Sequence, residues 1–276
     1  MLRKVHIFTE HSAAVTLLYP MSNQLEVLGV PIGALRMDDA VSSVAQHIDA
    51  RANCYVCAAD MNSVMQAQRN PAHRAALRGA HLVIPDGAPL AWVSRRRGHA
   101  DATRVSGPDF MLELSARGVS SGWRHYFYGG AEGVAQELAA QMQRRFPGLI
   151  VAGTDTPPFR PLTADEQQSA LDRINAARPH VVWIGLGCPK QELWMHAHAA
   201  KLPGAVVIGV GAAFDFHSNR VARAPQWMRQ SGLEWLHRLA SEPRRLWRRY
   251  LILGPQFVVL AARETQRLKR LKRVAA

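Results

Sequence analysis

A glycine-rich stretch, Gly185-Leu-Gly-Cys-Pro-Lys-Gln-Glu192, joins an apolar run to the next helical pattern. Glycines at such a junction let the backbone approach a phosphate, and the N–H groups of a helix N-terminus attract an anion. An ordinary strand–helix turn would use the same glycines, but three long polar side chains in the first helical turn favour phosphate binding. The stretch is neither the dinucleotide G-x-G-x-x-G motif nor a P-loop. Its candidate ligand-binding residues are Gly185, Gly187, Pro189, Lys190, Gln191 and Glu192.

Two aspartates, Asp60 and Asp86, also follow apolar runs. A carboxylate in such a position can act as a general base. Each has a structural interpretation as well, because Asp86 lies in a P-D-G turn and Asp60 could cap a helix. A second glycine-rich junction, Gly129-Gly130, is either a turn or a binding loop.

The elements that must position these residues follow from an alternation of short β-branched runs with longer amphipathic segments. Strands are expected at 25–30, 55–59, 81–84, 125–128, 149–152, 180–184 and 205–210. Helices are expected at 39–50, 61–78, 88–97, 108–117, 132–145, 163–177 and 190–201. This order predicts an α/β fold, a Rossmann-like parallel sheet with helices on both faces. Ligands bind beyond the carboxyl ends of such strands, so the four candidate loops are expected at one edge.

The alternation stops after Val210, and we expect three units: an N-terminal extension 1–24, an α/β core 25–220 and a basic helical appendage 221–276. No signal peptide is expected, because Glu10 and His11 interrupt the N-terminal apolar patch and no clear cleavage site follows. Cys54 and Cys57 form a C-x-x-C within an apolar run, where strand residues three apart face opposite ways. They are interpreted as core cysteines, which fits a reducing cytoplasm.

The positive charge is concentrated near the C-terminus. The net charge is +13, and residues 233–276 hold 11 Lys/Arg and 3 Glu, which is +8 of it. Such a block indicates a polyanionic partner: nucleic acid, anionic lipid or a phosphorylated substrate. Trp235, Trp247, Tyr250 and Phe257 within it suit an interfacial helix at an anionic membrane surface. No membrane span is expected, since the longest apolar run, 250–262, is shorter than the ~20 residues a span needs.

No metal and no cofactor are expected. The D-x-D pair with which many nucleotide-sugar transferases hold a divalent cation does not occur, and the twelve histidines show no metal spacing. Arginines would have to balance an anionic leaving group instead. The candidates are Arg238, Arg244, Arg245, Arg248 and Arg249, although a solvated or lipid-facing basic face would also explain such residues.

Several segments together resemble the WecG/TagA/CpsF family of bacterial glycosyltransferases. They are Asn62, Val83–Gly87, Arg104–Asp109, Tyr128–Gly130, Phe146–Gly148, Gly185–Glu192, Gly209–Gly211, Phe214-Asp215, Arg223–Pro225, Leu233–Arg238 and Glu242–Arg245. The resemblance implies a metal-independent, inverting transfer from a UDP-sugar to a saccharide on polyprenyl diphosphate. It also implies a peripheral enzyme at the inner face of the cytoplasmic membrane, in cell-surface or exopolysaccharide synthesis, with the donor sugar open among ManNAc, ManNAcA and glucose.

The resemblance places the catalytic base on Asp86. Asp60 stands where the family usually has threonine, so it could share that role or change the preferred sugar. The arginines that the appendage lends to the site fall on Arg238, Arg245 and Arg248, with Arg249 a close competitor. The other substrate-binding candidates are Asn62, Arg104, Gly129, Gly130, Gly209, Gly211 and Asp215.

Two other classes remain as alternatives. The charge alone would fit a nucleic-acid-binding protein, but no nucleic-acid motif appears and the charge is a C-terminal block, so no nucleic-acid partner is expected. A Rossmann-type dehydrogenase would need the missing G-x-G-x-x-G motif. The exposed apolar surface expected on the appendage could also pair two protomers, which leaves a homo-oligomer open.

Overall fold

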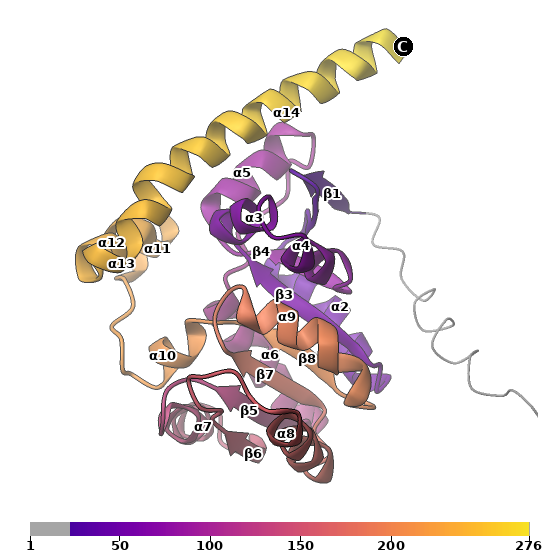
Figure 1. The fold of residues 1–276 in the computed structure, drawn as a ribbon, viewed down its shortest axis with the longest axis vertical. Helices are drawn as coiled ribbons and strands as arrows, with labels where there is room; N and C mark the ends of the chain where they lie inside the picture. The colour runs from indigo at the N-terminus through magenta and orange to yellow at the C-terminus, as the bar shows by residue number, and fades with distance from the viewer. Residues whose placement is uncertain (1–22, 276) are drawn as a thin grey trace, which may run out of the picture.

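The computed structural model describes residues 23–275, and a six-stranded sheet lies at its centre (Figure 1). The strands are β3 (Cys54–Ala59), β4 (Leu82–Pro85), β5 (Arg124–Gly129), β6 (Ile150–Asp155), β7 (Val181–Gly185) and β8 (Val206–Gly209). Their order is β4-β3-β8-β7-β5-β6, and all neighbours are parallel. The last strand along the chain, β8, therefore lies between β3 and β7. The predicted Rossmann-like α/β fold is confirmed.

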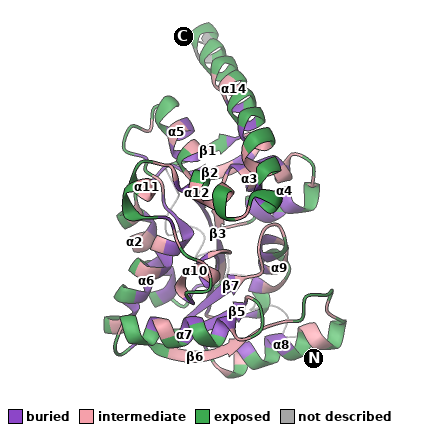
Figure 2. Cartoon of the chain, turned by 90° about the vertical axis from the view of Figure 1, so that its left-hand side faces the viewer, coloured by how far each residue is buried: buried purple, intermediate pink, exposed green. Residues whose placement is uncertain are grey.

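Helices cover both faces of this sheet. Successive strand residues point to opposite sides, so these apolar strands place apolar side chains on both faces, and both must be covered. On one face, Val56 and Ile208 pack with α2 (Met37–Asp49), α6 (Gly107–Ser121), α7 (Val134–Arg145) and α10 (Ala213–His217). On the other, Cys57 and Val207 pack with α3 (Met61–Ala67), α4 (Pro71–Arg78), α5 (Ala88–Arg96), α8 (Ala164–Ala176) and α9 (Lys190–His198). Figure 2 shows the buried strands enclosed between these two layers.

Two expected elements were wrong in detail. The run 25–30 is not one strand but an antiparallel hairpin, β1 (Gln24–Val27) and β2 (Val30–Gly33), because Leu28 and Gly29 turn the chain with positive φ. The expected helix 61–78 is split into α3 and α4. Pro71 lacks the N–H that a continuous helix needs, and Asn70 caps α4 instead. The expected extension 1–24 lies outside the described residues, apart from its last two.

The cysteines of the C-x-x-C are free and lie on β3. Cys57 is fully buried, and Cys54 is partly buried. Burial raises the pKa of Cys54 to about 12 and raises that of Cys57 well above its ordinary value. Their thiols therefore stay protonated at neutral pH, which supports the interpretation as core cysteines.

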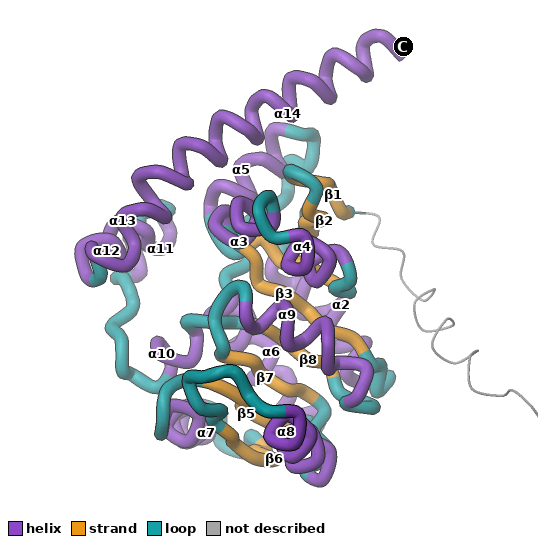
Figure 3. The backbone as a smooth tube through the Cα atoms, viewed as in Figure 1, coloured by secondary structure: helices purple, strands orange, loops and turns teal. Residues whose placement is uncertain are grey.

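After α10 the chain forms only helices, joined to the core by an extended loop (Figure 3). They are α11 (Gln226–Gln230), α12 (Glu234–Ser241), α13 (Pro243–Trp247), a π-helical turn η2 (Arg248–Leu253) and α14 (Gly254–Ala275). The segment folds back over the β3–β4 end of the sheet, where Phe257 and Ala261 of α14 are fully buried. Among the described residues, no helix is long and apolar enough to cross a membrane.

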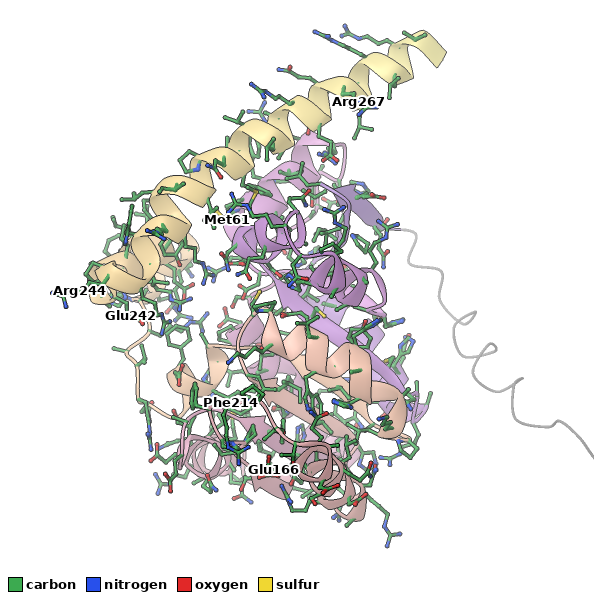
Figure 4. All side chains as sticks on the ribbon, viewed as in Figure 1. Met61, Glu166, Phe214, Glu242, Arg244 and Arg267 are labelled. Atoms are coloured by element: carbon green, nitrogen blue, oxygen red, sulfur yellow. The ribbon has the colours of Figure 1, made fainter. Side chains whose placement is uncertain are left out.

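A polar clamp holds α14 against the β1–β2 hairpin and α5. The Glu264 carboxylate accepts hydrogen bonds from the Leu28 backbone N–H and from the Arg97 guanidinium, at 3.0 and 2.5 Å. The same guanidinium donates to Thr265 Oγ1 at 3.0 Å. Beyond this clamp α14 extends away from the core, with Arg267 on its free part (Figure 4).

Candidate active site

A cavity of about 1130 Å³ opens at the carboxyl edge of the sheet and is closed on its other side by the helical appendage. Its walls come from the loops that follow β3, β4, β5, β7 and β8, which is the edge expected from the sequence. The site residues named from the sequence that line it are Asp60, Asn62, Asp86, Arg104, Gly130, Gly185, Gly187, Lys190, Gln191, Gly211, Asp215, Arg238, Arg245 and Arg249.

Five others, Gly129, Pro189, Glu192, Gly209 and Arg248, do not line the cavity. The first four support its walls: Gly129, for example, passes so close to Gly185 that a Cβ atom would lie 2.7 Å from that backbone. Arg248 does not line the cavity, and its role at the site stays a prediction. It is exposed and stacks on the Trp247 ring, while its neighbour Arg249 faces the cavity, because adjacent residues of a helical turn point in different directions. Arg244 also points outward (Figure 4).

Asp86 lies at the base of the cavity, immediately after β4. Its backbone N–H donates to the Ala59 carbonyl of β3 at 2.8 Å, which fixes the start of the turn. The side chain is 28% exposed and lines the cavity. Burial raises the pKa of Asp86 to about 6, and the nearby Asp60 and Glu234 carboxylates add to the rise. The Arg104 guanidinium and the Gly107 backbone N–H act in the opposite direction.

Asp60 caps a helix, which is one of its two sequence interpretations, and it also forms an ion pair, while its role as a base stays a prediction. One carboxylate oxygen caps α3 by accepting from the Ser63 backbone N–H at 3.0 Å. The other pairs with the Arg249 guanidinium of the appendage. The ion pair raises the pKa of Arg249, although burial alone would lower it. The charge of Asp60 is therefore balanced by Arg249 in direct contact, whereas no cation in the described part of the chain lies as close to Asp86.

Arg238 and Arg245 line the cavity together with Asp215, which lies on α10. Burial raises the pKa of Asp215, and the charges of Arg245 and Arg238 oppose this. Arg238 stacks on the Phe216 ring, with 5.6 Å from its Cζ atom to the ring centroid. Arg245 pairs with Glu242 at 2.8 Å and is largely exposed. Both arginines come from the appendage, so it contributes positive charge to the wall of the cavity.

The β7 turn supplies shape rather than charge. Gly185 packs on Phe214, where a Cβ would lie 2.5 Å from the ring, and Gly187 has a φ of +76° with open space around it. The Gln191 amide donates to Glu192 Oε1 at 2.8 Å. Its own Oε1 atom is buried without a hydrogen-bond partner among the described residues. This turn therefore presents backbone and amide groups to the cavity.

A polar cluster beneath the cavity was not expected from the sequence. The donor atoms of His73, Cys188 and Glu192 lie within 4.8 Å of one another, with 3.7 Å between His73 Nε2 and Glu192 Oε2. Burial raises the pKa of Glu192 to about 7 and lowers that of His73. Cys188 and Glu192 belong to the Gly185–Glu192 stretch, but His73 lies in α4, more than 100 residues earlier, so spacing gave no signal for the cluster. The expectation that the chain holds no metal stays a prediction.

Besides Asp60, two segments depart from the pattern that the family resemblance implies, Pro157-Pro-Phe159 and His217-Ser-Asn219. Pro157, Pro158 and Phe159 line the rim of the cavity, and the Phe159 side chain is 85% exposed. His217, in contrast, faces inward, with its Nε2 atom 2.9 Å from the Pro108 carbonyl. Of these two segments, only 157–159 lies where a bound ligand could reach it, as Asp60 does.

Comparisons with known proteins place the chain in a family of enzymes. A family model described as "Glycosyl transferase WecG/TagA/CpsF family" matches residues 25–271. The chain is 31% identical over 227 residues to the N-acetylglucosaminyldiphosphoundecaprenol N-acetyl-beta-D-mannosaminyltransferase of Bacillus spizizenii, covering 80% of this chain and 86% of that protein. It is 29% identical over 193 residues to the protein of the same name from Bacillus subtilis, covering 70% of this chain and 73% of that protein.

Proposed function

Because the chain belongs to the WecG/TagA/CpsF family of glycosyltransferases, we propose that it transfers a sugar from a UDP-sugar to a saccharide carried on polyprenyl diphosphate. The product would enter cell-surface polymer or exopolysaccharide synthesis. The observation that carries the proposal is Asp86, a carboxylate with a raised pKa, in a cavity whose opposite wall presents arginines. The names of both Bacillus relatives specify N-acetylmannosamine transfer, so an N-acetylhexosamine donor is the first candidate.

In the proposed mechanism, Asp86 removes the proton from the acceptor hydroxyl as that oxygen attacks the anomeric carbon. The bond from the anomeric carbon to the diphosphate breaks on the opposite face, which inverts the configuration, and UDP leaves with the electron pair. Proton removal by a positioned base contributes ~10²–10⁴-fold to such a step. Arg238, Arg245 and Arg249 would stabilise the charge that develops on UDP.

The donor is proposed to bind between the β7 turn and the loop after β8. Gly187 and Gly211 leave room for a diphosphate against the backbone, and Lys190 stands at the start of α9. Asn62 and Asp60, at the start of α3, would orient sugar hydroxyls. No metal is required in this proposal, because the appendage supplies the cations.

The appendage is also proposed to bind the inner face of the cytoplasmic membrane, where the lipid-linked acceptor lies. Large apolar side chains are exposed along it among basic residues, which is the composition of an interfacial helix. The exposed apolar residues are Trp227, Trp235, Leu236, Trp247, Leu251, Ile252, Val258, Val259, Leu260, Leu268, Leu271 and Val274. Each Lys or Arg close to an anionic leaflet adds about 1 kcal/mol to binding.

The function is tested with the full chain, a short polyprenyl diphosphate bearing GlcNAc, and a panel of UDP-ManNAc, UDP-ManNAcA and UDP-glucose. Mass spectrometry is expected to show addition of one N-acetylhexosamine residue, with UDP released in equal amount. Transfer from another donor would keep the reaction class and correct the sugar. Failure with every donor and acceptor, together with salt-dependent DNA binding that anionic liposomes do not compete for, would favour the nucleic-acid alternative.

A further inference from the structure

The Arg104 guanidinium lies between two carboxylates that come from different parts of the chain. Its Nη2 atom is hydrogen-bonded to Glu234 Oε2, on the first turn of α12, and is 4.0 Å from Asp86 Oδ1. The direct contact is therefore with the appendage and not with the aspartate at the end of β4. Arg104, which is 4.0 Å from Asp86, therefore forms its closer ion pair with Glu234.

Glu234 is held firmly in this position. It is only 8% exposed, and its second oxygen accepts from Arg223 Nε at 3.4 Å. Arg223 is fixed in turn by two hydrogen bonds to the Asp109 carboxylate of α6, at 2.6 and 2.8 Å. Burial would raise the pKa of Glu234, but the two arginines outweigh it and the pKa is lowered. Glu234 is therefore ionised at neutral pH and competes with Asp86 for Arg104.

Four charged side chains face Asp86 from the surrounding elements. Asp60, at the start of α3, and Glu234, on α12, are carboxylates; Arg104, before α6, and Arg249, on η2, are cations. Arg249 pairs with Asp60, and Arg104 pairs with Glu234. Both cations thus contact a second carboxylate more closely than they contact Asp86, whose ion pair with Arg104, at 4.0 Å, is the longest of the group.

We propose that Glu234 is a positioning residue that holds Arg104 away from Asp86 and so makes the basicity of Asp86 depend on docking of the appendage. The inference rests on the proposed role of Asp86 as the base. Without Glu234 nearby, the Arg104 guanidinium is free to close the 4.0 Å gap and pair with Asp86. A carboxylate in a direct ion pair has a lower proton affinity and is a weaker general base. A core whose appendage is not docked would therefore hold its base in a less active form.

The test is Glu234→Gln in the full chain, with Glu113→Gln as the matched control. Glu113 is exposed on α6, so that variant removes the same charge without touching the site. In Glu234→Gln the acidic limb of the kcat/KM profile is expected to move down by about one pH unit, with a rate at the plateau reduced ~10-fold. A second variant, Glu234→Gln with Arg104→Gln, removes the competing cation and should move the limb back to pH 6 or above.

A readout without substrate follows the Asp86 carboxyl directly. In protein with ¹³C-labelled aspartate, the Asp86 signal is identified by its loss in Asp86→Asn, and its titration should shift down in Glu234→Gln but not in Glu113→Gln. Glu234→Asp keeps the charge but has a shorter side chain, so the Asp86 titration should shift down less than in Glu234→Gln. This variant replaces Glu234→Gln in the test if the glutamine variant does not fold. A role in folding alone would lower activity and leave both the limb and the titration in place, which overturns the inference.

The outcomes separate this inference from the proposed function. If Asp86→Asn still transfers sugar, Asp86 is not the base and the mechanism itself is wrong. If Asp86→Asn is inactive while Glu234→Gln leaves the Asp86 titration unchanged, the mechanism stands and only the positioning role of Glu234 is lost.

Discussion

Asp60 and Arg249 form an ion pair that joins the N-terminus of α3 to the π-helical turn of the appendage. The two residues are 189 positions apart, and both line the cavity. The core and the appendage thus meet in the middle of the site. One carboxylate is neutralised there, and the second, Asp86, keeps a pKa above its ordinary value.

Asp86→Asn is expected to lose transfer by two or more orders of magnitude, because an amide cannot accept the acceptor proton. UDP affinity, measured by isothermal titration calorimetry, should stay within a few-fold of wild type. Asp60→Asn serves as the comparison and should lose less. If Asp60→Asn proves inactive and Asp86→Asn does not, the base has been assigned to the wrong aspartate.

The pH profile of the wild type should show an acidic limb near pH 6. Asp86 acts as a base only when ionised, and its pKa is raised to about 6, so kcat/KM rises with pH through 6 and is lost below it. An ordinary aspartate would place the limb near pH 4. An acidic limb near pH 4 in kcat/KM would contradict the raised pKa of Asp86.

The raised pKa also predicts a stability effect. A carboxyl whose folded pKa exceeds its unfolded value stabilises the protein at pH values below the unfolded pKa, and this contribution is lost as pH rises through the folded pKa. At pH 7.5 the ionised Asp86 therefore disfavours the folded state. Asp86→Asn should unfold at a higher temperature than wild type at pH 7.5, with the difference disappearing toward pH 4. A lower melting temperature at pH 7.5 would count against this.

The coupling between Asp60 and Arg249 can be measured by a double-mutant cycle. Asp60→Asn and Arg249→Gln should each reduce the unfolding free energy by about 1–3 kcal/mol, because each leaves a partly buried charge without its partner. The double variant should lose less than the sum of the two. Chemical denaturation of the four proteins gives the coupling energy, and additive losses would show that the ion pair does not hold the appendage.

Membrane binding should depend on the exposed apolar face of the appendage. Replacing Leu251 and Val259, both largely exposed, by glutamate should weaken sedimentation with anionic liposomes by ~10-fold or more. Transfer to a short, water-soluble acceptor should change little. Ile150→Glu, at an exposed apolar position on β6, is the matched control and should bind liposomes normally. Equal losses in both would indicate a general effect on folding.

The parallel sheet was predictable because its buried strands form short apolar runs that end in glycine or aspartate. Because the carboxyl ends of parallel strands lie at one edge of a sheet, the same pattern predicts that Asp86, Gly185 and Asp60 lie together there. The hairpin of β1 and β2 was missed, since a short run of alternating residues does not reveal a turn that depends on the positive φ of Leu28. The break between α3 and α4 was available from the sequence, in Asn70-Pro71, and was overlooked.

The appendage was harder to predict at the level of single residues. The composition predicts its helices and its charge. Which of Arg248 and Arg249 faces the cavity depends on the phase of a π-helical turn, and no sequence pattern specifies that phase. Glu234 and Arg223 lie in segments that matched the family, yet their partners, Arg104 and Asp109, are more than 100 residues away. Long-range ion pairs of this kind leave no periodic signal.

The position of β8 has a consequence for how the protein folds. This strand comes after all the others along the chain but bonds to β3 on one side and β7 on the other, so it joins two half-sheets that cannot otherwise meet. Its pairing with β3 links Cys54 to Val206, a long loop to close, and contacts between distant residues slow folding. Until β8 pairs, β3 and β7 each lack a neighbouring strand, and unpaired strand edges are sites at which chains aggregate.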